Sequence, residues 1–74
     1  MKTSDAIREV MKTEKVTQRA LCGRLNLPPT TLSGRLSQDN ISIDKLNEML
    51  RVLDYKIVIL PRDARIPEGG IEIE

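Results

Sequence analysis

Basic side chains gather in one stretch of this 74-residue chain. Between residues 12 and 37 there are five bases and one acid, a local charge of +4, although the whole chain carries only +1. Residues 61–74 contain two bases and four acids, and this acidic end hides the basic stretch in the total. Clustered positive charge favours contact with phosphate groups, but an ordinary solvated face would explain the charge equally well. The bases are Lys12, Lys15, Arg19, Arg24 and Arg35, and the acid is Glu14.

The residue types that carry most catalysis and metal binding are scarce. The chain has no histidine and a single cysteine, Cys22, so it lacks the ligand sets of zinc sites and the residue pairs of nucleophilic catalysis. It has no glycine-rich phosphate loop, and its acids fall on predicted solvent faces. We therefore predict that the protein is not an enzyme and holds no metal or cofactor. Cys22 is expected to be a small buried apolar residue.

Length and composition favour one small globular domain. Hydrophobic residues make up 39% of the chain and charged residues 31%, a balance typical of folded proteins. A core of this size gives little net stability, so help from a second copy is plausible. Tyr55 is the only aromatic residue, which argues against a binder of unpaired bases and leaves duplex binding open. No apolar run is long enough to span a membrane, and no signal-peptide core is visible, so we expect a cytoplasmic protein.

Apolar residues at helical spacing predict an all-α domain over residues 1–54. A first helix is expected over residues 4–13, capped by Thr3 or Ser4. A fourth helix is expected to begin after the cap Ser42. Its apolar positions are Ile43, Leu46, Met49, Leu50 and Leu53.

Two short helices with a tight turn between them are predicted in the middle of the chain. The first spans residues 17–25, with Thr17 as its N-cap, and Asn26 is suited to the left-handed conformation that ends helices. The second spans residues 29–36 and starts at Pro29, whose missing N–H is no loss at the first helical position. This arrangement is that of a helix-turn-helix.

Residues 55–60 form a β-branched apolar run that predicts a strand ending at Pro61. A single strand leaves its backbone groups unpaired, so we expect it to pair antiparallel with a second chain in a homodimer. The alternative is pairing with a short edge strand, Ile71 to Glu74, in a tail over residues 61–74 that is otherwise flexible. The predicted dimerisation residues are Tyr55, Ile57, Val58, Ile59 and Leu60.

The central sequence TQRALCGRLNLPPTTLS, residues 17–33, resembles the Cro and phage-repressor (xenobiotic-response-element) family. That family's usual pattern is Thr-Gln-x-x-Leu-Ala-x-x-Leu-Gly-Val-Ser-x-x-Thr-Leu/Ile-Ser. The resemblance runs without a gap over residues 4–60, and the segment from Ser42 to Leu53 is similar to the family's fourth helix. It implies a four-helix DNA-binding domain, in this case followed by a strand like that of some antitoxin repressors.

The resemblance also implies which side chains would touch DNA. The first residues of the second helix, Thr17, Gln18 and Arg19, would meet phosphates, and Gln18 is the strongest candidate. Weaker backbone contacts would come from flanking residues, namely Lys15, Arg19, Ser37, Gln38 and Asn40. Arg35 is expected at a partly buried position, from which it would contact either a backbone phosphate or a base. The base-reading positions would be Pro29, Thr30, Ser33 and Gly34.

The reading positions depart from the family pattern because none has a long hydrogen-bonding side chain. Repressors of this type often place Gln, Arg or Asn there to hold a base edge by two hydrogen bonds. Thr30 and Ser33 offer single hydrogen bonds, and the Pro29 ring could touch a thymine methyl group. We therefore expect modest direct reading, with DNA shape and deformability supplying much of the specificity.

These features predict a homodimeric transcriptional regulator that binds a palindromic operator in double-stranded DNA. It would be a repressor or the antitoxin-type autoregulator of a small operon, with a cognate toxin as a possible protein partner. The alternative is a protein-interaction module that keeps the fold without reading DNA.

Overall fold

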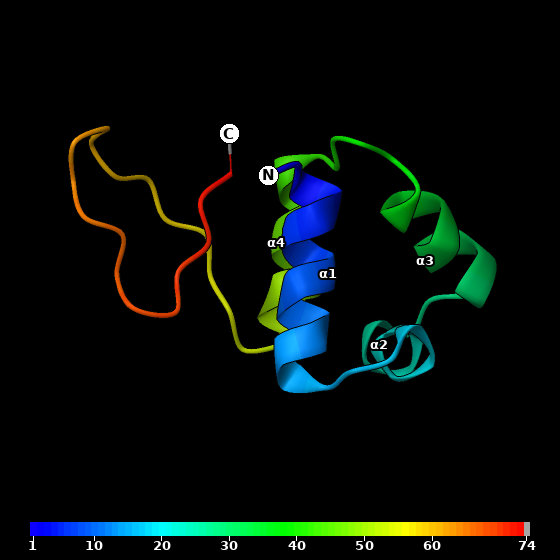
Figure 1. The fold of residues 1–74 in the computed structure, drawn as a ribbon. Coiled ribbons are helices and arrows are strands. Elements are labelled where there is room, and N and C mark those ends of the chain that lie inside the picture. Colours follow the sequence, from blue (N-terminus) through cyan, green and yellow to red (C-terminus); the bar gives the residue numbers. More distant parts are fainter. Residues whose placement is uncertain (74) are drawn as a thin grey trace.

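Four α-helices form the folded part of the chain, as Figure 1 shows. A computed structural model describes residues 1–73 and contains α1 (Thr3–Glu14), α2 (Gln18–Leu25), α3 (Pro29–Leu36) and α4 (Ile43–Arg51). Helices α1 and α4 lie side by side, and α2 and α3 pack together against this pair. The predicted all-α domain is therefore confirmed. The bounds of α3 agree with the prediction, and those of α1 and α2 differ by one residue.

The predicted ends of the helices are confirmed at four positions. Thr17 Oγ1 accepts a hydrogen bond from the N–H of Ala20 at 3.1 Å, and Ser42 caps α4 in the same way. Asn26 ends α2 in the left-handed conformation, with φ of 57°. Pro29 is the first residue of α3. Each of these side chains or backbone preferences acts within a few residues, so the local sequence sets these ends.

The start of α1 differs from the prediction, because neither Thr3 nor Ser4 caps the helix. Lys2 is the N-cap and makes no capping hydrogen bond, and Thr3 and Ser4 are the first two residues of the helix. Their hydroxyls bind the α3–α4 loop instead. Thr3 Oγ1 accepts from the N–H of Ile41 at 2.6 Å, and Ser4 Oγ donates to the carbonyl of Asp39 at 3.3 Å. Partners more than 30 residues away have taken the place of the local ones.

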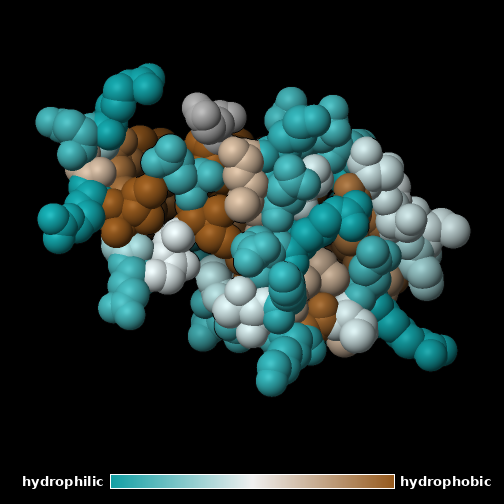
Figure 2. Space-filling model, in the orientation of Figure 1, coloured by the Kyte–Doolittle hydropathy of each residue, from teal (hydrophilic) through white to brown (hydrophobic). Residues whose placement is uncertain are grey.

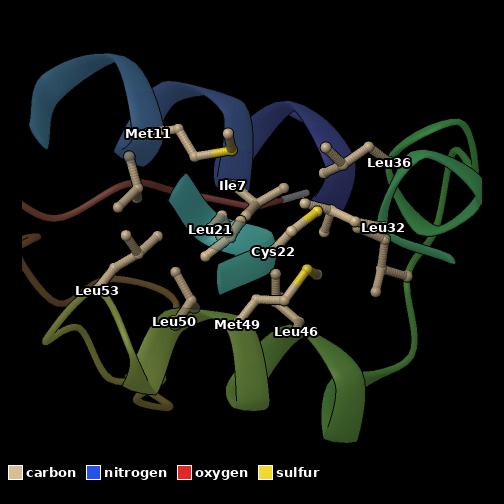
Figure 3. Packing of buried hydrophobic residues seen from close by; sticks show 12 residues of the cluster. Ile7, Met11, Leu21, Cys22, Leu32, Leu36, Leu46, Met49, Leu50 and Leu53 are labelled. Carbon is tan, nitrogen blue, oxygen red and sulfur yellow. The ribbon is translucent and has the colours of Figure 1, made fainter. Parts of the chain in front are cut away.

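The core is a single aliphatic cluster to which all four helices contribute (Figure 3). Leu21 of α2 and Leu32 of α3 are fully buried at its centre, together with Leu46 of α4. Cys22 is a buried free thiol packed in this cluster, as its expected apolar role requires. The cluster consists of Ile7, Val10, Met11, Leu21, Cys22, Leu32, Leu36, Ile41, Leu46, Met49, Leu50 and Leu53.

Helix α4 follows the predicted apolar stripe with two corrections. Ile43, expected on the buried face, is 60% exposed. Ile43 lies at the edge of the helix face formed by Leu46, Met49 and Leu50, which point into the core. A small rotation of the helix therefore leaves the Ile43 side chain in solvent. The helix also ends at Arg51, and Leu53 is buried from the following turn.

The chain leaves α4 through Asp54, which has a left-handed φ of 65°, and continues as an extended segment over residues 55–60. No strand occurs within residues 1–73, so the predicted strand is not formed in this single chain. The tail then loops outward and returns to place Ile71 against the core (Figure 1). The alternative tail strand also has no counterpart in residues 71–73, and its last residue, Glu74, lies outside the described residues. Among residues 1–73 no helix has the length and apolar character needed to cross a membrane.

Candidate nucleic-acid interface

Helices α2 and α3 and the turn between them make up the candidate interface. The turn follows Leu25 and brings the two helices into direct contact. Leu32 and Leu36 hold α3 in the core, and Leu21 does the same for α2. With these residues buried, the opposite side of α3 must face outward. In Figure 1 this side and the extended segment 55–60 lie at opposite ends of the molecule, so the two predicted sites do not overlap.

All four predicted reading residues, Pro29, Thr30, Ser33 and Gly34, are exposed on α3. A Cβ atom added at Gly34 would meet no atom within 4 Å, so this surface is unobstructed. The hydroxyls of Thr30 and Ser33 make no side-chain hydrogen bond within residues 1–73. They are therefore available to an outside partner. The side chains of this face are short, so it can approach a partner closely while offering few donors.

The first turn of α2 carries the candidate phosphate contacts. Thr17, Gln18 and Arg19 are all exposed. Thr17 uses its hydroxyl on the N–H of Ala20, which leaves the N–H groups of Gln18 and Arg19 directed out of the helix end. A helix N-terminus with free N–H groups attracts anions, and the amide side chain of Gln18 adds a neutral donor. This end of α2 can therefore bind a phosphate without a buried charge.

Two of the five bases in the positive stretch are used inside the protein. Arg35 Nη1 lies 3.2 Å from Glu48 Oε1, and the Arg35 side chain is only 13% exposed. Arg24 Nη1 donates to the carbonyl of Val52 at 3.3 Å. The exposed bases of the stretch are thus Lys12 and Lys15 at the end of α1, and Arg19 and Arg24 on α2. The structure places Arg35, predicted to contact phosphate, against α4 instead.

The α3–α4 loop carries the remaining predicted contacts, Ser37 and Gln38, which are both exposed. Ser37 Oγ donates to the carbonyl of Gly34 at 2.8 Å and so stabilises the end of α3. Asp39 of the same loop lies 3.2 Å from Nζ of Lys2, the N-cap residue of α1, in an exposed ion pair that contributes little to stability. The ion pair does offset the negative charge of Asp39, the only acid in the loop.

Sequence reasoning missed the residues that hold α3 and this loop in place. Arg8 Nη2 on α1 donates to the carbonyl of Leu36 at 2.7 Å and satisfies the C-terminal end of α3. Thr3 and Ser4 fix the loop at Ile41 and Asp39. These pairs are 28 to 38 residues apart in the sequence, and no local pattern marks them. All three residues act as positioning residues for the interface.

The predicted dimerisation residues form the second candidate surface. Tyr55 and Ile57 are half-buried against the core, whereas Val58, Ile59 and Leu60 are exposed. Figure 2 shows hydrophobic residues gathered at this end of the molecule and more polar residues over the α3 end. Tyr55 also donates its hydroxyl to Glu14 Oε2 at 3.1 Å. That hydrogen bond raises the pKa of Tyr55, with burial and the Glu14 charge acting in the same direction.

Within residues 1–73 no cluster of three potential metal ligands occurs. Comparison with known proteins found no matching family, no similar curated protein and no similar solved structure. The functional assignment therefore rests on the chain's own residues.

Proposed function

We propose that this protein is a duplex-DNA-binding transcriptional regulator, acting as a repressor or as an antitoxin-type autoregulator. The observation that carries the proposal is the outer face of α3. Leu32 and Leu36 anchor this helix in the core, while Thr30 and Gly34 present a polar face with no obstruction around it. A short helix anchored in this way after a tight turn is the element that helix-turn-helix proteins insert into the major groove.

In this proposal the first turn of α2 sets the position of the protein on the DNA backbone. Gln18 and the free N–H groups beside it bind one phosphate, and Lys15 and Arg19 add charge next to it. These contacts are the same for every DNA sequence. They supply affinity and a strong dependence on salt, but no choice of base.

Base choice comes from α3 and is modest. Thr30 and Ser33 each supply one hydrogen bond, and the Pro29 ring suits a thymine methyl group. Because Arg35 is held by Glu48, no long donor extends from α3. Deformation of the DNA therefore carries much of the discrimination between operators.

The functional unit in this proposal is a homodimer in the cytoplasm. Residues 55–60 of two copies pair as strands about a twofold axis. This pairing would satisfy backbone groups of residues 56–60, which make no hydrogen bond within residues 1–73. Two copies of α3 placed about 34 Å apart would read successive major grooves of a palindromic operator. Occupation of the operator would exclude polymerase.

Fluorescence anisotropy tests the proposal directly. The full chain is titrated into a labelled duplex from its own upstream region and into a scrambled duplex of equal length, at two salt concentrations. We expect tighter binding to the upstream duplex and a steep loss of affinity at the higher salt. Equal affinity for the two duplexes under both conditions would contradict sequence-specific binding.

The alternative function is a protein-interaction module, and the exposed apolar residues Val58, Ile59 and Leu60 are the observation in its favour. A module of this kind would use the same fold to hold a protein such as a toxin. It predicts no preference between the two duplexes, so the anisotropy titration separates the two functions.

A further inference from the structure

We propose that the 55–61 segment pairs antiparallel with the same segment of a second copy, in a register centred on Val58. Lys56, Val58 and Leu60 exchange backbone hydrogen bonds across the axis, whereas the odd-numbered residues do not. This register specifies how the two chains of the proposed homodimer pair. It rests on that homodimer but does not depend on DNA binding.

The two backbone edges of the segment differ in how many complete donor and acceptor sites they offer. Tyr55 donates its N–H to the carbonyl of Leu50 at 2.9 Å, and Pro61 has no N–H to donate. In an extended segment the N–H and C=O groups of alternate residues point to opposite edges. Residues 55, 57, 59 and 61 therefore share one edge. Ile57 and Ile59 make no backbone hydrogen bond there within residues 1–73, but Tyr55 is bound to α4 at one end and Pro61 lacks a donor at the other, so this edge offers two complete sites.

The even-numbered residues form the free edge, on which all three sites are complete and unpaired. Within residues 1–73 no hydrogen bond uses the N–H or C=O of Lys56, Val58 or Leu60. Three consecutive donor and acceptor sites thus lie unpaired along this edge, against two on the other. An edge of this kind is a template for another strand, and its unpaired groups make such pairing favourable.

The two ends of the segment select the register. A twofold axis at residue 57 would place Leu60 opposite Asp54, whose left-handed φ of 65° takes it out of the extended conformation. An axis at residue 59 would place Lys56 opposite Arg62, which lies in a turn closed by the Ala64 N–H on the Pro61 carbonyl. Only an axis at Val58 pairs all three free residues with extended residues.

The same register explains an exposed side chain. Tyr55 and Ile57 pack on their own core, and Ile59, on the same face, is 96% exposed because the chain has passed the edge of the domain. With the axis at Val58, Ile59 lies opposite Ile57 of the second copy. The core face of the second domain then covers it, and the apolar surface becomes continuous across the dimer.

Cysteine cross-linking of the full chain tests the register in the absence of DNA. Val58→Cys places two thiols in a directly opposed pair about 5.5 Å apart at Cα, within the range of a disulfide. We expect a disulfide-linked dimer under mild oxidation. Leu60→Cys is the matched control, because its two copies are four residues out of step, about 13 Å apart, and should not link. The unchanged chain, with its buried Cys22, controls for the native thiol.

Mixing Lys56→Cys with Leu60→Cys gives a second, positive test. These positions oppose each other in the proposed register, so the mixture should form the heterodimer although neither variant links to itself. Equal linking of Val58→Cys and Leu60→Cys would overturn the register. A chain that sediments as a monomer at high concentration would overturn the dimer itself.

Proline substitution tests which edge is used. Val58→Pro removes an N–H that the register needs, whereas Ile59→Pro removes one that points to the other edge. We expect Val58→Pro to raise the dimer Kd by roughly tenfold more than Ile59→Pro, measured by sedimentation. The opposite order would overturn the proposal. None of these measurements uses DNA, so a failure here and a failure of DNA binding can be told apart.

Discussion

Arg35 on α3 and Glu48 on α4 form an ion pair, with Nη1 and Oε1 3.2 Å apart. Arg35 is the only arginine or lysine on α3, and this contact directs it toward the neighbouring helix. The proposed reading face is left with short side chains. Under the proposed function, DNA specificity would therefore depend on Glu48 of α4, which lies outside the proposed interface.

Glu48→Gln should strengthen DNA binding. Without the carboxylate, Arg35 is free to reach a backbone phosphate, which adds about one unit to the salt slope for each subunit. Glu9→Gln on α1 is the matched control, because it removes an equal charge from an exposed position. Anisotropy titrations over a range of salt concentrations measure both. Identical slopes for the two variants would show that Arg35 is not released.

Gln18→Ala and Thr30→Ala should affect DNA binding in different ways. Loss of the Gln18 phosphate contact should weaken binding to all duplexes alike, by about 1 kcal/mol or about fivefold. Loss of the Thr30 hydroxyl should change which sequence is preferred. A panel of operator variants with single base changes measures both effects. A uniform loss from Thr30→Ala would contradict its role as a reader.

Gly34→Ala and Gly23→Ala should stabilise the fold equally but differ in their effect on DNA affinity. Each glycine lies within a helix with no atom within 4 Å of an added Cβ, so alanine should raise the free energy of unfolding by up to about 1 kcal/mol. Gly34 lies on the face of α3 that is proposed to enter the major groove of DNA, whereas Gly23 lies in the second half of α2. We expect only Gly34→Ala to change affinity. Urea denaturation and anisotropy on the same two variants provide the measurements.

Thr3→Val should destabilise the protein by about 1–3 kcal/mol, because the buried N–H of Ile41 loses its acceptor. Ser4→Ala is the control on the same turn of α1. It removes only a donor to the exposed Asp39, whose carbonyl can turn to water. The cost should therefore be smaller. Chemical denaturation measures the free energy of unfolding of both variants. Equal losses of stability would mean that the Thr3–Ile41 hydrogen bond contributes no more than the Ser4–Asp39 one.

Titration of Tyr55 should show a pKa above its ordinary value of about 10, because its hydroxyl donates to Glu14. The raised pKa means that the folded state holds this proton more tightly than the unfolded state. The associated stability is present below about pH 10 and is lost as pH rises through the folded-state pKa.

The absorbance of tyrosinate follows this titration without interference, since Tyr55 is the only tyrosine and the chain has no tryptophan. Glu14→Gln should move the pKa back toward its ordinary value. Tyr55→Phe should remove this step from the dependence of stability on pH. An unshifted pKa in the unchanged chain would mean that the hydrogen bond does not persist in solution.

The sequence by itself determined the helices and most of their ends. Thr17, Asn26, Pro29 and Ser42 act through hydrogen bonds or backbone preferences that reach no further than one turn, so their effect can be read locally. The apolar stripe of each helix likewise follows from a spacing of three to four residues. These local rules predicted helices α2 and α3, the turn between them and the burial of Leu21, Leu32 and Leu36.

Only the tertiary structure decided how polar groups far apart in the sequence pair with each other. It gave Thr3 a partner at Ile41 instead of a capping role, and it drew Arg35 toward Glu48. Burial of the surrounding side chains brings these groups together, and a pattern read along the chain does not contain that proximity. The free edge of residues 55–60 was decided in the same way, by the contact of Tyr55 with Leu50 at the end of α4.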